Sequence, residues 1–141
     1  MKNNTSRLLL RIASIIMLLH AVGHTLSIIS WQKQNGKIPF GVVKIMQDIH
    51  FSFQGKDATM AAFFSGHGYA GAILLLLITS ILWLLSDSKD KSSTKILSLT
   101  GFAIIFLAID ELIYFFPMAV AFSLIAAVLV FISIQLINKA E

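Results

Sequence analysis

His20 and His24 stand four residues apart in an almost wholly apolar stretch of the sequence. On a helix this spacing places both imidazole rings on one face. Two imidazoles so placed can reach a single metal ion, and zinc, iron and copper all accept imidazole nitrogen. A carboxylate from Asp110 or Glu111 would complete the ligand shell. The pattern therefore gives a metal hypothesis, in which His20, His24 and Asp110 are the ligands.

Three further ionisable residues, His67, Asp110 and Glu111, also stand inside apolar stretches. Ionisable side chains within a membrane segment are costly, so each is a functional candidate by default. Adjacent carboxylates point about 100° apart on a helix, so one of the two is expected to face the other helices and one to point outward. A carboxyl group beside a neutral histidine would form an acid–base pair. Haem ligation would need His67 opposite His20 or His24.

The same residues also fit a purely structural role, in which each histidine bonds a facing carbonyl, serine or carboxylate and holds helices together. Two hypotheses therefore stay open. One is a structural or accessory membrane subunit. The other is a site for a metal ion or a membrane-soluble small molecule, with any catalysis being acid–base or metal-assisted. The residues expected to bind that ligand are His20, His24, His67, Asp110, Glu111 and Tyr114.

The composition indicates the elements that must position these side chains. The chain of 141 residues is 57% hydrophobic and 13% charged, with a mean hydropathy of +0.83. A soluble domain carries roughly a quarter charged residues, so a soluble fold and a disordered chain are both excluded. The sequence has no cysteine, so thiolate sites and disulfides are excluded as well. The basic excess flanks apolar segments and does not indicate nucleic-acid binding.

Apolar segments long enough to cross a bilayer, about 20 residues each, occupy residues 8–31, 58–85, 96–116 and 118–137. Only helices satisfy every backbone group of an open chain inside lipid. We therefore expect an all-α fold without strands, a bundle of four transmembrane helices forming a single domain over residues 1–141. Pro117 suits the first turn of a helix, so the last two helices should form a tight hairpin.

The long loop, residues 32–57, separates the first two spans. Between residues 38 and 51 its apolar residues recur at helical spacing, which fits either a short helix on the membrane surface or a loop packed over the bundle. Small residues at Ser65, Gly66, Gly68 and Gly71 predict close helix approach in the second span. The aromatic residues near the same end of the spans fit an aromatic belt.

The distribution of Lys and Arg sets the expected orientation. Seven lie in the N-terminal end, the short charged loop and the tail, and four lie in the long loop. The positive-inside rule then places both termini in the cytoplasm and all five buried ionisable groups in the outer half of the membrane, beneath Asp48 and His50. Residues 2–23 also resemble a cleavable signal peptide, but the apolar stretch continues to Trp31, an expected interface anchor.

Short motifs distributed over nearly the whole chain resemble a family of small uncharacterised bacterial four-helix integral membrane proteins. The matching positions are His20, Gly23, His24, Phe51, Gly55, Phe63, Phe64, Gly66, Gly68 and Tyr114 to Pro117. The resemblance implies a multi-pass protein of the bacterial inner membrane and lends no activity. His67 stands where an aromatic residue is more usual in that family. The expected partners are the lipid bilayer, other membrane subunits or further copies of this chain, and a membrane-soluble small molecule.

Overall fold

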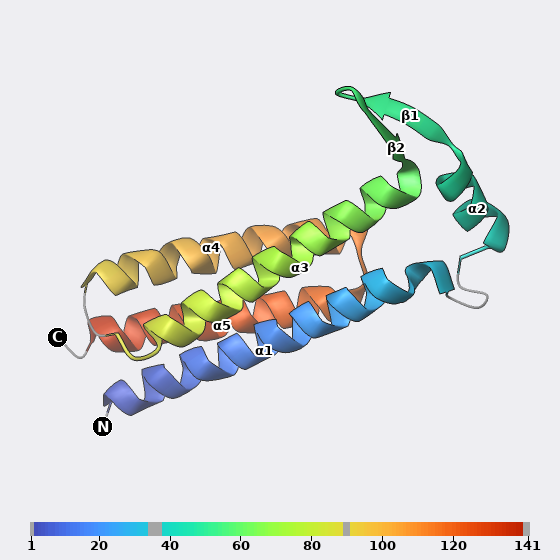
Figure 1. The fold of residues 1–141 in the computed structure, drawn as a ribbon. Coiled ribbons are helices and arrows are strands. Elements are labelled where there is room, and N and C mark those ends of the chain that lie inside the picture. The colour runs from blue at the N-terminus through green and yellow to red at the C-terminus, as the bar shows by residue number, and fades with distance from the viewer. Residues whose placement is uncertain (1, 34–37, 89–90, 140–141) are drawn as a thin grey trace. The chain divides into compact units, whose positions relative to one another are not determined.

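The computed structural model describes residues 2–33, 38–88 and 91–139. The described elements are mainly helices (Figure 1). In chain order they are α1 (Lys2–Ser30), the short 3-10 helix η1 (Trp31–Lys33), α2 (Phe40–Asp48), β1 (His50–Phe53), β2 (Lys56–Thr59), α3 (Met60–Leu85), α4 (Lys91–Tyr114) and α5 (Pro117–Asn138).

Within the described residues four helices are long and apolar enough to cross a membrane, which confirms the four predicted apolar helices. Their apolar faces are widely exposed. Leu84, Leu99 and Leu112 each expose more than 70% of their surface, as expected for side chains that face lipid. The helices begin or end up to six residues away from the predicted bounds, because hydropathy detects the apolar part of a helix and not its polar end turns.

The α4–α5 hairpin confirms the prediction made from Pro117. Helix α4 ends at Tyr114, Phe116 is extended with φ −114° and ψ 155°, and Pro117 opens α5. A residue before proline disfavours the helical conformation, which explains why the turn falls there. The two helices then pack closely. A Cβ atom on Gly101 would lie 2.9 Å from the Phe131 ring, so α5 approaches α4 where the side chain is missing.

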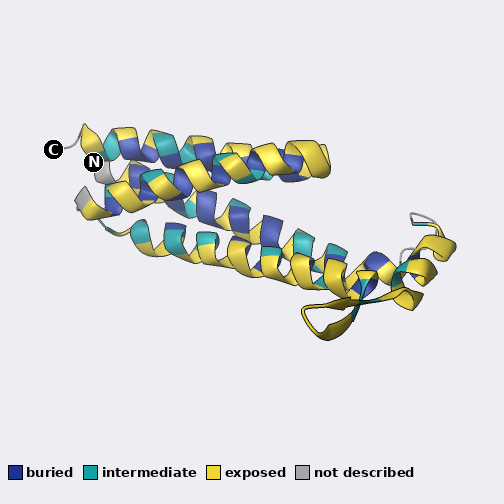
Figure 2. Cartoon of the chain, turned by 90° about the horizontal axis from the view of Figure 1, so that it is seen from above, coloured by how far each residue is buried: buried dark blue, intermediate teal, exposed yellow. Residues whose placement is uncertain are grey.

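The chain divides into two compact units, which are described separately. The first unit comprises Met1–His20 and Leu75–Glu141, that is, the first part of α1, the last part of α3, and α4 and α5. Its buried residues, dark blue in Figure 2, recur along one face of each helix. The largest fully buried apolar side chains are Leu10, Met17, Leu82, Leu97, Ile104 and Val130.

The second unit, Ala21–Leu74, contains the segment predicted as a long loop. That segment does include the short helix, α2, with Val43 buried. It also contains an antiparallel hairpin of β1 and β2, so the prediction of a fold without strands is wrong. Gln54 and Gly55 both have positive φ, 51° and 79°, a conformation typical of tight two-residue hairpin turns.

The core of this second unit forms around Trp31. Its side chain is only 4% exposed and packs with Val43 and Ala61. Its indole N–H donates a hydrogen bond to the Ser65 hydroxyl over 3.2 Å, and its ring meets Phe64 edge-on with 4.9 Å between centroids. Trp31 was expected to anchor the first span at the membrane interface. Its contacts are instead internal, and they tie the end of α1 to α2 and α3.

Candidate buried polar site

His20 and Glu111 form the most deeply buried ionisable pair among the described residues. The Nε2 atom of His20, on α1, lies 3.2 Å from Oε1 of Glu111, on α4. The two side chains are only 7% and 5% exposed. Both belong to the first unit. The predicted pairing of a histidine with a carboxylate is therefore present, and the carboxylate is that of Glu111.

Ser123 of α5 extends this pair into a three-residue arrangement. Its side chain is fully buried, and its hydroxyl oxygen lies 3.5 Å from Nδ1 of His20, a long contact. With a neutral imidazole the Nε2–H group can donate to Glu111. The Ser123 hydroxyl, which has a single proton, interacts both with Nδ1 of His20 and with the Glu111 carboxyl group. Phe122, the preceding residue on α5, stacks on the imidazole with 5.8 Å between centroids. Three helices thus meet at His20.

One carboxylate oxygen of this site lacks a hydrogen-bond partner among the described residues. The second carboxylate oxygen of Glu111, Oε2, is buried and has no hydrogen-bond partner among the described residues. A buried oxygen that carries negative charge without a donor is energetically costly. Protonation of Oε2 would remove that charge and leave the contact between His20 and Oε1 in place. The site therefore has a position where one proton fits.

Asp110 and Tyr114 do not belong to the buried arrangement, although both were predicted ligand-binding residues. The side chain of Asp110 is exposed, and Tyr114 exposes 74% of its surface. The expected division of the two adjacent carboxylates is confirmed, since Glu111 points inward and Asp110 outward. The two side chains diverge because consecutive residues leave a helix about 100° apart, and the rotation of α4 about its axis decides which of them points inward.

His24 belongs to the second unit and has a different kind of partner. Its Nε2 atom lies 3.0 Å from the carbonyl oxygen of Gly68 on α3. A carbonyl only accepts, so Nε2 carries the proton and donates it. Gly71 keeps space for the same ring, because a Cβ there would lie 3.0 Å from Nε2. For His24 the structural interpretation, a hydrogen bond to a facing carbonyl, matches the geometry.

His67 bonds within its own helix. Its Nδ1 atom lies 3.0 Å from the carbonyl oxygen of Phe63, one turn earlier, and its side chain is exposed. His50, in the hairpin, pairs with Asp57 across the strands at 2.8 Å, and both side chains are more than half exposed. The four histidines thus have four different types of surroundings.

The predicted metal site of His20, His24 and Asp110 is not supported by this geometry. Within residues 2–33, 38–88 and 91–139, no group of three or more His, Cys, Asp or Glu side chains could hold a metal ion. The prediction joined residues by helical spacing alone, and spacing does not determine which side chain a neighbouring helix presents. His20 meets Glu111, whereas Asp110 points outward.

Ser123 is the residue of this site that the sequence interpretation missed. Serine is common in membrane helices and marks no motif here. A signal was nevertheless present, because Ser123 shares a helix face with Ala119, Ala126 and Ala127, all buried. A stripe of small residues in a membrane helix indicates the face that packs closely on its neighbours. A serine on that face is positioned to bond another helix.

Comparisons with protein-family models, with curated proteins and with solved structures found no match to this chain. The resemblance to a family of small bacterial membrane proteins therefore stays a prediction. A function for this chain must be inferred from the geometry of the buried site.

Proposed function

We propose that this chain is a multi-pass membrane protein whose His20–Glu111–Ser123 centre binds one proton. The observation that carries the proposal is the buried Oε2 atom of Glu111, which has no hydrogen-bond partner among the described residues. Its other carboxylate oxygen contacts a histidine at 3.2 Å. A proton takes the place of the metal ion or membrane-soluble small molecule that was expected from the sequence.

Proton uptake changes the net charge of the centre from −1 to zero. Before uptake, a neutral His20 faces an ionised Glu111. After uptake, the added proton is either on Oε2 of Glu111 or on His20, which are two forms of one coupled pair. Both forms have no net charge, and an apolar interior favours a centre without net charge. Ser123 remains neutral throughout and orients the ring through Nδ1.

Few other ionisable groups face the centre from the helices of the first unit. Helix α5 contains no Asp, Glu, His, Lys or Arg between Pro117 and Asn138. The part of α3 between Leu75 and Leu85 contains none either. On α4 the neighbouring acid, Asp110, is exposed. Glu111 and His20 are therefore the two buried ionisable residues of this centre.

Infrared difference spectroscopy of the protein in lipid tests the proposal. Between about pH 4 and about pH 9, a range that spans the ordinary values of Glu and His, a band of the centre should appear and disappear, either the C=O band of a protonated Glu111 or the imidazolium band of a protonated His20. Glu111→Gln should abolish or displace this band. Asp110→Asn is the matched control, because it removes the adjacent exposed acid of the same helix, and it should leave the band in place. A spectrum in which Glu111→Gln changes no band would contradict the proposal.

A second candidate function, a structural or accessory membrane subunit, is favoured by the hydrogen bond from His24 to the Gly68 carbonyl. There a membrane histidine connects two helices through a group that does not titrate near neutral pH. If His20 and Glu111 act in the same way, the infrared spectra will show no pH-dependent band of the centre. The partners of such a subunit would be other membrane proteins or further copies of this chain.

The orientation forms part of the same proposal. With seven Lys and Arg residues flanking one side of the spans and four on the other, we place both termini in the cytoplasm and the protein in the bacterial inner membrane. Cysteine-accessibility labelling checks this, because the chain has no native cysteine. A cysteine introduced at exposed Gln47 should react from outside the cell, and one introduced at Lys139 should not.

A further inference from the structure

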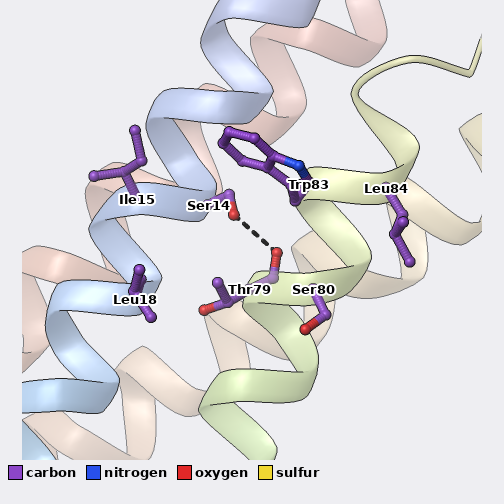
Figure 3. A pocket seen from close by; sticks show the side chains of 7 residues that line it. All are labelled: Ser14, Ile15, Leu18, Thr79, Ser80, Trp83 and Leu84. Atoms are coloured by element: carbon purple, nitrogen blue, oxygen red, sulfur yellow. Dashed lines mark hydrogen bonds between the residues drawn. The ribbon is translucent and has the colours of Figure 1, made fainter.

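A lipid-facing groove runs between α1 and α3 in the first unit (Figure 3). Helix α1 contributes Ser14, Ile15 and Leu18, and α3 contributes Thr79, Ser80, Trp83 and Leu84. The groove has a volume of about 410 Å³. Leu18 follows Arg11 by seven residues, so the groove extends about 10 Å along α1 from the level of Arg11. That is most of the depth of one leaflet, since half the hydrocarbon core is about 15 Å.

The hydroxyl groups in the groove are all occupied by backbone carbonyls. Ser14 donates across the groove to the carbonyl of Thr79 at 2.8 Å, as Figure 3 shows. Thr79 and Ser80 donate to carbonyls one turn earlier on α3, those of Leu75 and Leu76, both at 2.9 Å. The remaining lining consists of aliphatic and indole groups. The hydroxyl groups of the groove therefore have no proton left for a ligand, and the aliphatic lining suits an apolar chain.

The end of the groove carries positive charge. Arg11 lies one turn before Ser14 and Ile15, and its guanidinium carbon lies 4.9 Å from the centre of the Trp83 ring. Its Nη2 atom lies 3.3 Å from Asp87, and Nε of Arg7 lies 2.7 Å from the same carboxylate. Two guanidinium groups share one carboxylate, which leaves a net charge of +1.

These two arginines also have hydrogen-bond donors to spare. Each guanidinium has five N–H groups. The contacts of Arg7 use Nε, and those of Arg11 use Nε, towards Ser86, and Nη2. The two Nη atoms of Arg7 and Nη1 of Arg11 make no hydrogen bond to the described residues. The side chains of Arg7 and Arg11 are 48% and 32% exposed, so a ligand can reach both.

We propose that this groove binds an anionic phospholipid, with an acyl chain along α1 and α3 and the phosphate at Arg7 and Arg11. Guanidinium groups bind phosphate in a two-pronged geometry that a lysine cannot reproduce. Trp83 lies where the apolar groove meets the charged end, the position that tryptophan favours at a membrane interface. A lipid with a zwitterionic headgroup lacks the net negative charge that the unbalanced +1 attracts. Apolar walls and a cationic end thus match the two parts of one molecule.

Native mass spectrometry of the full chain, released from micelles with equal amounts of phosphatidylglycerol and phosphatidylcholine, tests this proposal. We expect one phosphatidylglycerol molecule to be retained in preference to phosphatidylcholine. Arg7→Gln and Arg11→Gln should each weaken its apparent affinity about tenfold, because each removes charge-assisted hydrogen bonds. Lys139→Gln, the same charge change at an exposed residue in the tail, should leave the affinity unchanged.

Two further variants separate the groove from the charges. Ser80→Phe should fill the groove and reduce lipid retention while Arg7 and Arg11 remain. Asp87→Asn removes the acid that competes for both arginines and should tighten binding several-fold, a gain that a misfolded variant would not produce. A variant that fails to fold is recognised by its circular dichroism spectrum, and the other variants then decide.

Several results would overturn the proposal. The proposal is contradicted if the protein retains phosphatidylglycerol and phosphatidylcholine equally. It is also contradicted if Arg7→Gln and Arg11→Gln both leave the affinity for phosphatidylglycerol unchanged. Stabilisation by inorganic phosphate that equals stabilisation by phosphatidylglycerol would show that the arginines bind free anions. A dimer that Ser80→Phe dissociates would show that a second copy of the chain covers the groove in place of lipid.

Discussion

His20 and His24 are one helical turn apart on α1, yet they have partners of different chemical kinds. His20 contacts the carboxylate of Glu111 at 3.2 Å, whereas His24 donates to the carbonyl of Gly68 at 3.0 Å. A carboxylate can take up a proton and a backbone carbonyl cannot near neutral pH. The role of each of these histidines therefore depends on the group that the facing helix places beside it.

The facing residues explain the difference. At His24 the helix α3 has Gly68 and Gly71, and without Cβ atoms a side chain can approach its backbone carbonyl. At His20 the helix α4 places Glu111 inward and α5 adds a serine. The first arrangement fixes two helices together. The second also holds helices together, but it contains groups whose charge can change.

The largest expected effect is the loss of stability on removing one member of the His20–Glu111 pair. His20→Ala leaves a buried carboxyl group without its partner and should destabilise the protein by about 3 kcal/mol. Replacing both residues by leucine should recover most of that loss, because apolar side chains of similar volume pack without an unmatched charge. Unfolding in mixed micelles measures both variants. If the double variant is less stable than His20→Ala, the pair stabilises the folded protein by more than the compensation of its own buried charges.

A smaller effect is expected from the glycine that exposes the carbonyl to His24. In Gly68→Ala the added Cβ would overlap with Ile28 of α1, and overpacking of this kind costs about 2 kcal/mol. Gly66→Ala is the matched control on the same helix, since no atom lies within 4 Å of its Cβ position. The same unfolding assay compares them. Equal stabilities for the two variants would show that close approach at Gly68 is unimportant.

His24→Ala should cost about 1 kcal/mol, the usual size of an interhelical hydrogen bond inside a membrane. The cost is smaller than for His20→Ala because the Gly68 carbonyl can keep its bond within α3. The infrared carboxyl band of the His24→Ala variant should match that of the unmodified protein. A loss as large as that of His20→Ala would mean that the two histidines act as one site after all.

The smallest effect is expected for His67→Ala, which should change the free energy of unfolding by less than about 0.5 kcal/mol. The His67 ring is exposed, and among the described residues its contacts are with Phe63 on its own helix, through the Phe63 carbonyl and ring. This variant therefore sets the baseline for histidine substitution in the same assay. A substantial loss of stability would indicate that His67 has a partner outside this chain.

The four spans could be predicted from the sequence because an apolar stretch of some 20 residues has few alternatives to a membrane helix. The α4–α5 turn could be predicted from Pro117 for a similarly local reason. The hairpin of β1 and β2 was not predicted, although His50 to Phe53 alternate polar and apolar residues, because each strand has only four residues, β2 does not alternate, and the turn is Gln54–Gly55. The pair Gln54–Gly55, which follows Phe51 and Phe53, was a weak indication of a hairpin turn.

The members of the buried site were largely predictable from the sequence, whereas their pairing was not. His20 and Glu111 stand out because ionisable groups inside a membrane span are costly. The choice between Asp110 and Glu111, and the addition of Ser123, depends on how α1, α4 and α5 are rotated about their axes. Rotation is set by long-range packing, and one sequence does not specify it.

The most direct test of the proton-binding centre is a pH titration of His20 by nitrogen-15 NMR, with the protein in lipid bilayers. We expect the ring resonances of His20 to shift as the centre takes up a proton, and Glu111→Gln to remove or displace this transition. The ring resonances of His24, bonded to a carbonyl, should be the same in that variant as in the unmodified protein. If Glu111→Gln leaves the titration of His20 unchanged, the two residues do not form one proton-binding centre, and the proposed function is contradicted.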